Sequence, residues 1–165
     1  MSTFNVRRAS ELEGKPRKEQ WLIEGLWAAE AVGIVGGEPK CCKSFLALDV
    51  AVAVASGTPC LRRFPVQRSG PVLLFAAEDA LHVVRERLVG ICHAAHVPFG
   101  DLDVHVITNP IIRLDVQDDR KKLLETVQAV RPTLLILDPF VRLHRIDENQ
   151  AAEVAPLLAT LREIQ

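Results

Sequence analysis

Four nearly continuous apolar runs, separated by polar turns and by segments of helical spacing, dominate the pattern of the chain. They cover residues 31–35, 71–76, 104–107 and 133–137, and each is rich in Val, Ile or Leu. Apolar runs of this length predict strands that are buried on both faces of a parallel sheet. Residues 64–66 and 111–114 are candidates for two shorter strands.

The segments between the runs have the spacing of helices. Residues 43–56 are apolar almost all round and stop at Gly57, which predicts a helix covered by its neighbours. Two amphipathic stripes predict two further helices, the second of them capped by Asp118 and ended before Pro132. The stripes consist of Leu81, Val84, Leu88, Ile91 and Ala95, and of Leu123, Leu124, Val127 and Val130.

Strands that alternate with helices predict the α/β class, with a mostly parallel β-sheet flanked by helices. Residues 1–20 are polar and charged and predict an N-terminal arm, so the core is expected over residues 21–165. Its last helix is predicted from about Asn149 or Pro156, and Pro156 is expected to kink or restart it. The Trp- and Leu-rich patch at residues 21–27 is interpreted as packing over a sheet edge, with stacking on an adenine base as the alternative.

Composition narrows the class of protein. The 165 residues are 48% hydrophobic and 25% charged, which suits one globular domain with a full core. The formal net charge is −1, so a nucleic acid would have to bind a local basic patch. No apolar run has the length of a membrane span or the setting of a signal peptide, which predicts a cytoplasmic protein that does not contact a membrane.

The cysteines show no C-x-x-C pairing, which predicts reduced thiols and no disulfide framework. They are Cys41, Cys42, Cys60 and Cys92. The adjacent pair Cys41-Cys42 is either sensitive to oxidation or simply two small inert side chains. Cys92, His93 and His96 lie close together on one predicted helix. Three ligands on one helix with no second cluster make a poor zinc site, so surface and boundary positions are favoured.

A glycine-rich turn between the first apolar run and the first predicted helix carries the strongest chemical signal. Turn and helix start read Gly37-Glu38-Pro39-Lys40-Cys41-Cys42-Lys43-Ser44-Phe45. Backbone N–H groups at such a turn and at a helix N-terminus converge on an anion, which predicts a nucleotide-binding loop of the Walker A type. Lys43 would then reach the β- and γ-phosphates of ATP, and Ser44 would hold Mg²⁺. The alternative is a glycine-rich turn with a capping serine and no ligand.

Two acidic residues follow predicted strands, Glu78 after residues 71–76 and Asp138 after residues 133–137. Ligands of open α/β sheets bind beyond the carboxyl ends of the strands, so both carboxylates are expected near the phosphate loop. Asp138 is predicted to complete the Mg²⁺ shell as a Walker B residue. Glu78 is predicted to polarise the attacking water as a general base. The alternatives are a turn residue before Pro139 for Asp138, and for Glu78 a helix cap, which Asp79 could equally provide.

These segments together resemble the RecA-like ATPases of the plasmid RepA helicase type, the AAA_25 group. The resemblance is carried by residues 37–48, Phe75-Ala76-Ala77-Glu78-Asp79, Leu135-Ile136-Leu137-Asp138-Pro139 and Asp147-Glu148-Asn149. Residues 21–26 and 57–66 are similar as well, so it covers nearly everything after residue 20. It implies a RecA-like P-loop core in which Lys43 and Glu78 are catalytic and Ser44 and Asp138 hold Mg²⁺. It also implies a DNA partner, a homo-oligomeric ring such as a hexamer, and an Arg87 that faces the nucleotide or a neighbouring subunit.

The chain departs from that group in two places. Cys42 stands where the motif G-x-x-x-x-G-K-[ST] has its second glycine, and a side chain there obstructs either the backbone geometry or the phosphate. Binding is expected to survive at some cost, because cysteine is small. The sequence also stops at Gln165, before the strands that usually finish the sheet, so we expect an incomplete core from the N-terminal part of a longer protein.

Three functions are consistent with these residues. The first is an Mg²⁺-dependent ATPase in a DNA-associated helicase, replication or repair assembly, with Arg142 and Arg145 either touching DNA or merely solvated. The second is a nucleotide-binding regulatory or assembly module with little or no hydrolysis because of Cys42. The third is a degenerate domain that retains only the scaffold.

Overall fold

The computed structural model describes residues 4–12, 14, 20–145 and 151–165, the side chains of residues 151–153 excepted. The predicted motif at residues 147–149 and a helix start at Asn149 lie outside this description. Described residues of the predicted arm, 4–12 and 14, are exposed and contain one 3-10 turn, η1 (Ala9–Glu11).

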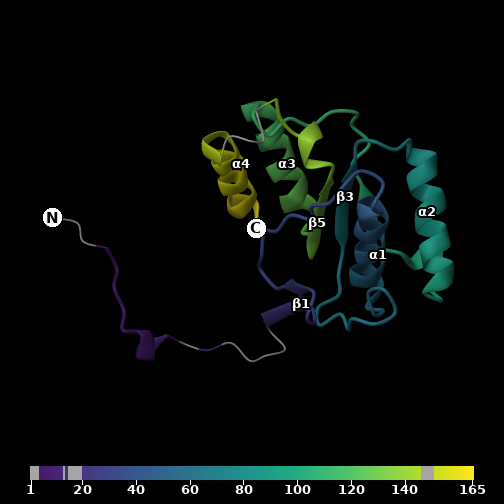
Figure 1. Cartoon of the computed structure of the whole chain (residues 1–165), viewed down its shortest axis with the longest axis horizontal. Helices are drawn as coiled ribbons and strands as arrows, with labels where there is room; N and C mark the ends of the chain where they lie inside the picture. Colours follow the sequence, from purple (N-terminus) through teal and green to yellow (C-terminus); the bar gives the residue numbers. More distant parts are fainter. Residues whose placement is uncertain (1–3, 13, 15–19, 146–150) are drawn as a thin grey trace.

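A three-stranded parallel sheet forms the centre of the molecule. Its middle strand is β3 (Val72–Ala76), with β4 (Val104–Val106) on one side and β5 (Leu134–Asp138) on the other. Helices α1 (Lys43–Ser56) and α2 (Leu81–Ala94) lie on one face, and α3 (Gln117–Val130) and α4 (Ala151–Ile164) on the other (Figure 1). The predicted α/β class, with helices flanking a parallel sheet, is confirmed.

The middle strand is buried on both faces because its side chains alternate between two cores. Leu74 packs with Leu48 and Val52 of α1 and with the apolar stripe of α2. Phe75, the next residue, packs on the opposite side with buried residues of α3 and α4. The sequence of β3 is therefore apolar at every position because helices cover both faces of the sheet.

Helix α1 has the bounds that the sequence predicts. Gly57 ends it with φ 74°, a left-handed conformation that glycine adopts without strain, and donates its N–H to the Ala53 carbonyl. Helices α2 and α3 also match the predicted stripes. Asp118, however, does not cap α3: the N-cap is Val116, and Asp118 lies in the first turn, where a carboxylate still favours the helix dipole.

Residues 31–35 are not a strand, contrary to the prediction. They form an extended segment in which Ile34 and Val35 are 60% and 49% exposed, and no strand of the described structure pairs with it. Apolar β-branched residues favour extended backbone, but a strand also needs a neighbouring backbone to accept its N–H groups. The Trp27 ring instead packs against this segment, only 2.8 Å from the position of a Cβ added at Gly33.

Two further predicted strands are absent from the described residues, and the last helix continues past Pro156. Residues 64–66 make only isolated bridges, Ile23 with Val66 and Cys60 with Phe64. Residues 111–114 form a loop, in which Ile112 and Leu114 are buried, Ile111 is exposed, and the Leu114 N–H donates to the Leu143 carbonyl. Pro156 does not restart the helix, because α4 runs without interruption from Ala151 to Ile164 and contains it.

A small antiparallel pair, β1 (Trp21–Ile23) and β2 (Trp27–Ala28), precedes the sheet. Leu22, Ile23 and Trp27 pack into the core cluster beneath α1, so the packing interpretation of this patch holds. In Figure 1, β1 lies at the end of the molecule opposite to the carboxyl ends of the parallel strands. None of the helices in the described ranges is long and apolar enough to cross a membrane.

Candidate functional site

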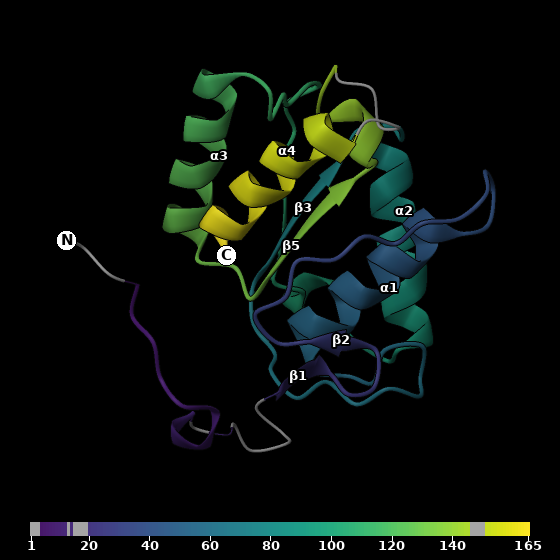
Figure 2. The same cartoon turned by 60° about the vertical axis from the view of Figure 1, so that its left-hand side comes forward.

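The glycine-rich loop leads directly into α1 and is held by one lysine. The Lys43 ammonium donates to the Gly37 carbonyl at 2.8 Å and to the Glu38 carbonyl at 2.7 Å. Figure 2 shows the chain before α1 as a loop that projects from the body of the molecule. Because residues 36–42 are exposed, no apolar packing fixes the loop, and Lys43 is its main internal tie.

Gly37 and Cys41 touch inside the loop. A Cβ added at Gly37 would lie 2.8 Å from the Cys41 sulfur, a distance that real Cβ atoms do not adopt. The same sulfur lies 3.6 Å from the Lys43 nitrogen. A side chain at position 37 would therefore require the Cys41 sulfur, which lies beside Gly37, to move.

Cys42 has φ 65° and ψ 23°, a left-handed conformation, at the N-cap of α1. For a residue with a Cβ this conformation costs roughly 1–2 kcal/mol, which explains why the motif has glycine here. Lys40 has φ 64° and carries a similar strain. Of the two obstructions considered from the sequence, backbone geometry is the one that the structure shows.

The two acidic candidates lie at one sheet edge. Ala76 is in register with Asp138 across the β3–β5 pair, and the Ala77 N–H donates to the Asp138 carbonyl at 2.8 Å. Glu78 follows one residue later and is exposed, whereas Asp138 is half-buried. The N-terminal end of α1 lies on the same side of the molecule as these strand ends (Figure 1). The ends of β3 and β5 and the start of α1 therefore lie on one side of the molecule (Figure 1).

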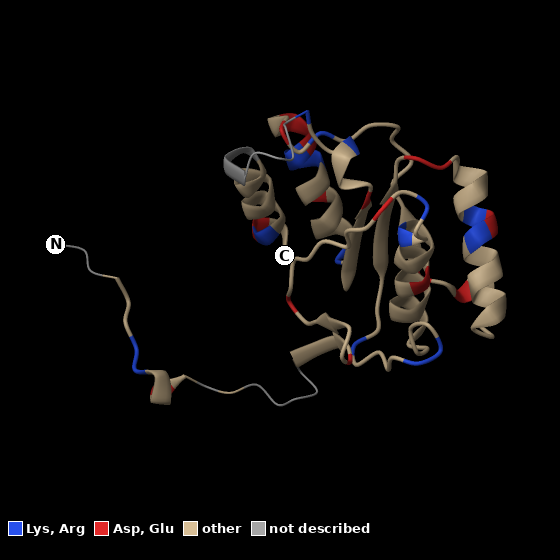
Figure 3. Ribbon diagram, viewed as in Figure 1, with Lys and Arg blue, Asp and Glu red and all other residues tan. Residues whose placement is uncertain are grey.

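No hydrogen bond or ion pair joins Lys43 to Glu78 or Asp138 within the described residues; the lysine bonds its own loop instead. Figure 3 shows basic residues on the loop before α1 and acidic residues on the segment after β3. The structure thus has a cationic loop and an acidic strand edge on one side of the molecule. Direct contact between them is not a feature of this conformation.

Arg87 of α2 links the acidic segment to α1. Its guanidinium donates twice to the Asp79 carboxylate, one bond measuring 3.1 Å, and lies 5.0 Å from the centre of the Phe45 ring. Such a pair is geometrically specific, and stacking of a cation on an aromatic ring adds to it. Asp79 is therefore an ion-pair residue rather than a helix cap. The family resemblance implied instead that Arg87 faces the nucleotide or a neighbouring subunit, and no local spacing between residues 79 and 87 signals the pair with Asp79.

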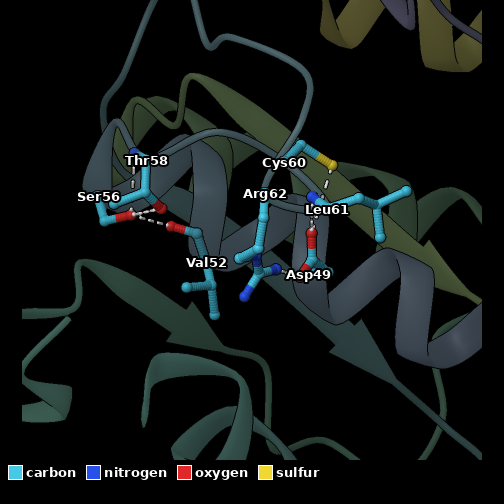
Figure 4. Close-up of polar contacts among 7 residues, drawn as sticks. All are labelled: Asp49, Val52, Ser56, Thr58, Cys60, Leu61 and Arg62. Atoms are coloured by element: carbon cyan, nitrogen blue, oxygen red, sulfur yellow. Dashed lines mark hydrogen bonds and ion pairs between the residues drawn. The ribbon is translucent and has the colours of Figure 1, made fainter. Parts of the chain in front are cut away.

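A buried carboxylate further along α1 was missed from the sequence. Asp49 is 7% exposed and accepts the Leu61 N–H at 2.6 Å, with the Cys60 sulfur at 3.4 Å and an ion pair to Arg62 (Figure 4). Asp49 is the one charged residue between Ser44 and Ser56, and a single charge in an otherwise apolar helix is the sequence feature that could have indicated a buried, paired carboxylate. It fastens the loop after α1 to the helix.

An open cavity of about 500 Å³ runs along the first half of α1. Its lining includes Cys41, Cys42 and Lys43 from the loop, Phe45 and Leu46 from the first turn, and Asp49 and Leu61 further along. The lining is mostly apolar, with charged groups at its two ends. A ligand that enters it could reach the phosphate loop with one end and an apolar wall with the other.

The remaining candidates lie away from this site. Cys92 is buried in the core, whereas His93 and His96 are exposed, and no group of three metal-ligating side chains occurs in the described part of the chain. Burial raises the pKa of the Cys92 thiol above its ordinary value. Arg142 and Arg145 are exposed after β5.

The chain matches the model of a known protein family. The model of the family described as AAA domain, AAA_25, matches residues 2–165. No curated protein sequence matches the chain. The family match spans both the phosphate loop and the two acidic strand ends.

Proposed function

The chain belongs to the AAA domain family, a family of ATPase-type nucleotide-binding domains, and we propose that it is an Mg²⁺-dependent ATPase of the RecA-like, RepA helicase type. One observation carries the proposal: the Lys43 ammonium is directed into a glycine-containing loop at the start of α1. A lysine in this position, with backbone N–H groups around it, is the arrangement that cradles the phosphates of a nucleotide.

Phosphate binding would exchange the partners of Lys43. Two backbone carbonyls now accept its hydrogen bonds, and anionic phosphate oxygens are stronger acceptors for an ammonium than carbonyls. The first turn of α1 adds free N–H groups and the positive end of the helix dipole. Phe45, half exposed beside Ser44 and stacked by Arg87, would form the apolar rim of the site.

The residues that we propose for Mg²⁺ fit a hard cation. Ser44 offers a hydroxyl and Asp138 a carboxylate, and oxygen ligands of this kind are what Mg²⁺ prefers. When bound, the ion would supply charge neutralisation at the phosphates. Glu78, exposed at the same sheet edge, is the proposed base that accepts a proton from the attacking water.

Arg87 is proposed to position this base. The Asp79–Arg87 pair fixes the segment that carries Glu78, and the Phe45 contact fixes that segment to the first turn of α1. A displacement of either end would be transmitted to the other. This assignment replaces the expectation that Arg87 faces the nucleotide or another subunit.

Steady-state phosphate release by Glu78→Gln tests the catalytic proposal. We expect a fall of at least about 100-fold, because general-base catalysis typically contributes 10²–10⁴-fold, with unchanged nucleotide affinity. Glu86→Gln, an exposed carboxamide substitution on α2, is the matched control and should keep the rate. Equal rates for Glu78→Gln and the wild type would contradict the role of Glu78.

A regulatory or assembly module that holds nucleotide without turnover is the second candidate, favoured by the strained backbone of Cys42. Such a module would bind nucleotide in a Lys43-dependent way and release phosphate at a rate that Glu78→Gln does not change. A degenerate scaffold would show no Lys43-dependent binding at all. The two measurements therefore separate all three functions.

We further propose that the ATPase acts on DNA as a cytoplasmic homo-oligomeric ring. The family resemblance and the two exposed arginines after β5, Arg142 and Arg145, support this extension. Phosphate release is expected to rise with single-stranded DNA, and the double variant Arg142→Ala/Arg145→Ala to lose most of that rise. The exposed pair Arg7→Ala/Arg8→Ala is the control. Stimulation that survives in the first double variant would contradict a DNA contact by this loop.

A further inference from the structure

The phosphate loop contains two exposed thiols, Cys41 and Cys42, that the ATPase proposal does not use. They differ in where they stand. Cys41 places its sulfur inside the loop, 3.6 Å from the Lys43 nitrogen and against Gly37. Cys42 occupies the N-cap of α1 and lines the cavity beside it.

The other two cysteines are protected from solvent. Cys60 and Cys92 are 0% and 1% exposed. Burial raises the pKa of both thiols above the ordinary value of 9.0, which keeps them in the unreactive protonated form near neutral pH. We therefore expect thiol reactions at Cys41 and Cys42 of the phosphate loop, which are the exposed cysteines.

We propose that Cys41 is a modification site for small anionic disulfides, of the class of oxidised glutathione, and that the adduct blocks the phosphate loop. The thiol first loses its proton to solvent. The Cys41 sulfur then attacks one sulfur of the disulfide, a new S–S bond forms to Cys41, and the other half of the reagent departs as a thiolate. No further oxidant is required, because the reagent is reduced as Cys41 is oxidised.

Charge selects the reagent. The loop carries Lys40 and Lys43 against one carboxylate, Glu38, so its local charge is positive and attracts an anion. The ammonium of Lys43 stands beside the Cys41 sulfur, which attacks the disulfide. An anionic disulfide should therefore react faster than a cationic one such as cystamine, and the difference should shrink at high salt.

The adduct would occupy the space needed by phosphates. The Cys41 sulfur lies close to Gly37, 2.8 Å from the position of an added Cβ, so a peptide-sized group on that sulfur has little room in the loop and would push the loop open. Opening the loop separates Lys43 from the Gly37 and Glu38 carbonyls. This consequence rests on the proposed nucleotide-binding function, whereas the choice of Cys41 does not.

Incubation of the full chain with oxidised glutathione, followed by fragmentation mass spectrometry, tests the site. We expect an adduct on Cys41 in the wild type and in Cys42→Ser, no loop adduct in Cys41→Ser, and at least tenfold slower reaction with cystamine. Circular dichroism checks that both serine variants fold. An adduct mainly on Cys42, Cys60 or Cys92, or equal rates with the two reagents, would overturn the assignment.

A fluorescent ATP analogue tests the consequence. The Cys41 adduct should weaken its binding at least tenfold, and reduction with dithiothreitol should restore binding. Unchanged affinity of the adduct would overturn the blocking of the loop. If the reduced protein itself binds no nucleotide, the ATPase proposal and the block fail together, while the adduct map still decides whether Cys41 is the reactive thiol.

Discussion

The segments before and after α1 both contain non-glycine residues with positive φ, but different contacts hold them in place. These residues are Lys40 and Cys42 before the helix, and Leu61 and Arg62 after it. After the helix, the buried Asp49 carboxylate holds the strained turn. Before the helix, the half-exposed side chain of Lys43 holds the loop, with one long backbone bond from the Cys41 N–H to the Glu38 carbonyl at 3.4 Å.

This difference separates stability from binding along one helix. A turn fixed by a buried carboxylate is part of the core, and its loss is felt by the whole fold. A loop fixed by an exposed ammonium can exchange those bonds for a ligand at little cost to the fold. We therefore expect substitutions before α1 to change affinity and substitutions after it to change the free energy of unfolding.

The largest expected effect is on nucleotide binding by Lys43→Ala. Removal of a charged donor from the phosphates should weaken binding about 100-fold, or ~2.8 kcal/mol, while the free energy of unfolding changes by less than about 0.5 kcal/mol. Titration with a fluorescent ATP analogue and a urea melt measure the two quantities. Lys40→Ala, also exposed and in the same loop, is the control and should bind nearly as the wild type. Equal binding by Lys43→Ala and the wild type would remove the basis for the phosphate site.

Asp49→Ala should show the opposite pattern. It leaves the Leu61 N–H without its acceptor and Arg62 without its partner, at a cost of about 2 kcal/mol in unfolding free energy. The estimate is kept low because the Arg62 side chain is 41% exposed and water screens the ion pair. Asp49→Asn, which keeps an acceptor oxygen, should recover about half of the loss. A loss below about 0.5 kcal/mol for the alanine variant would show that this turn needs no anchor.

Cys42→Gly sharpens the comparison from the loop side. Relief of the left-handed strain, about 1–2 kcal/mol, exceeds the extra entropy lost by glycine, about 0.5–1 kcal/mol, so a net gain of about 0.5 kcal/mol is expected. Nucleotide should bind more tightly, since the loop no longer resists this conformation. Cys42→Ala keeps the strain and is the control; a gain of equal size there would assign the effect to the thiol instead.

The smallest effect concerns pH. The buried Cys60 and Cys92 have folded pKa values above 9.0, so the folded state holds protons that the unfolded state releases at high pH. Their contribution is complete below the unfolded pKa and is lost as pH rises towards the folded pKa, so both thiols lower the free energy of unfolding at pH 9 relative to pH 7. Urea melts of the wild type and of Cys60→Ser/Cys92→Ala at pH 7 and pH 9 measure the difference. Parallel pH dependence in both proteins would contradict it.

Local patterns predicted most of the helices but not every strand. The end of the helix at residues 43–56 could be predicted because Gly57, a local signal, terminates it. Residues 31–35 have the composition of a strand, yet Ile34 and Val35 stand in solvent without a paired backbone. A helix satisfies its own hydrogen bonds, whereas a strand depends on a partner far away in the chain.

The candidate site divides in the same way. The phosphate loop and the two acidic strand ends were predicted, because residue type and order along the chain identify them. The pairing of Arg87 with Asp79 and of Asp49 with Leu61 was not, because each joins residues on different elements. The variants described above test the function of these residues in the site.

Local sequence was enough to locate the buried parallel strands and most helix ends, and to predict which residues would approach a nucleotide. Only the tertiary structure decided that Cys42 must adopt a left-handed backbone, that Cys41 lies inside the loop, and that Asp49 is a buried anchor. The physical reason is the distance along the chain over which each effect acts. Spacing and capping act over a few residues, while strain, close approach and burial depend on what the rest of the fold brings beside each atom.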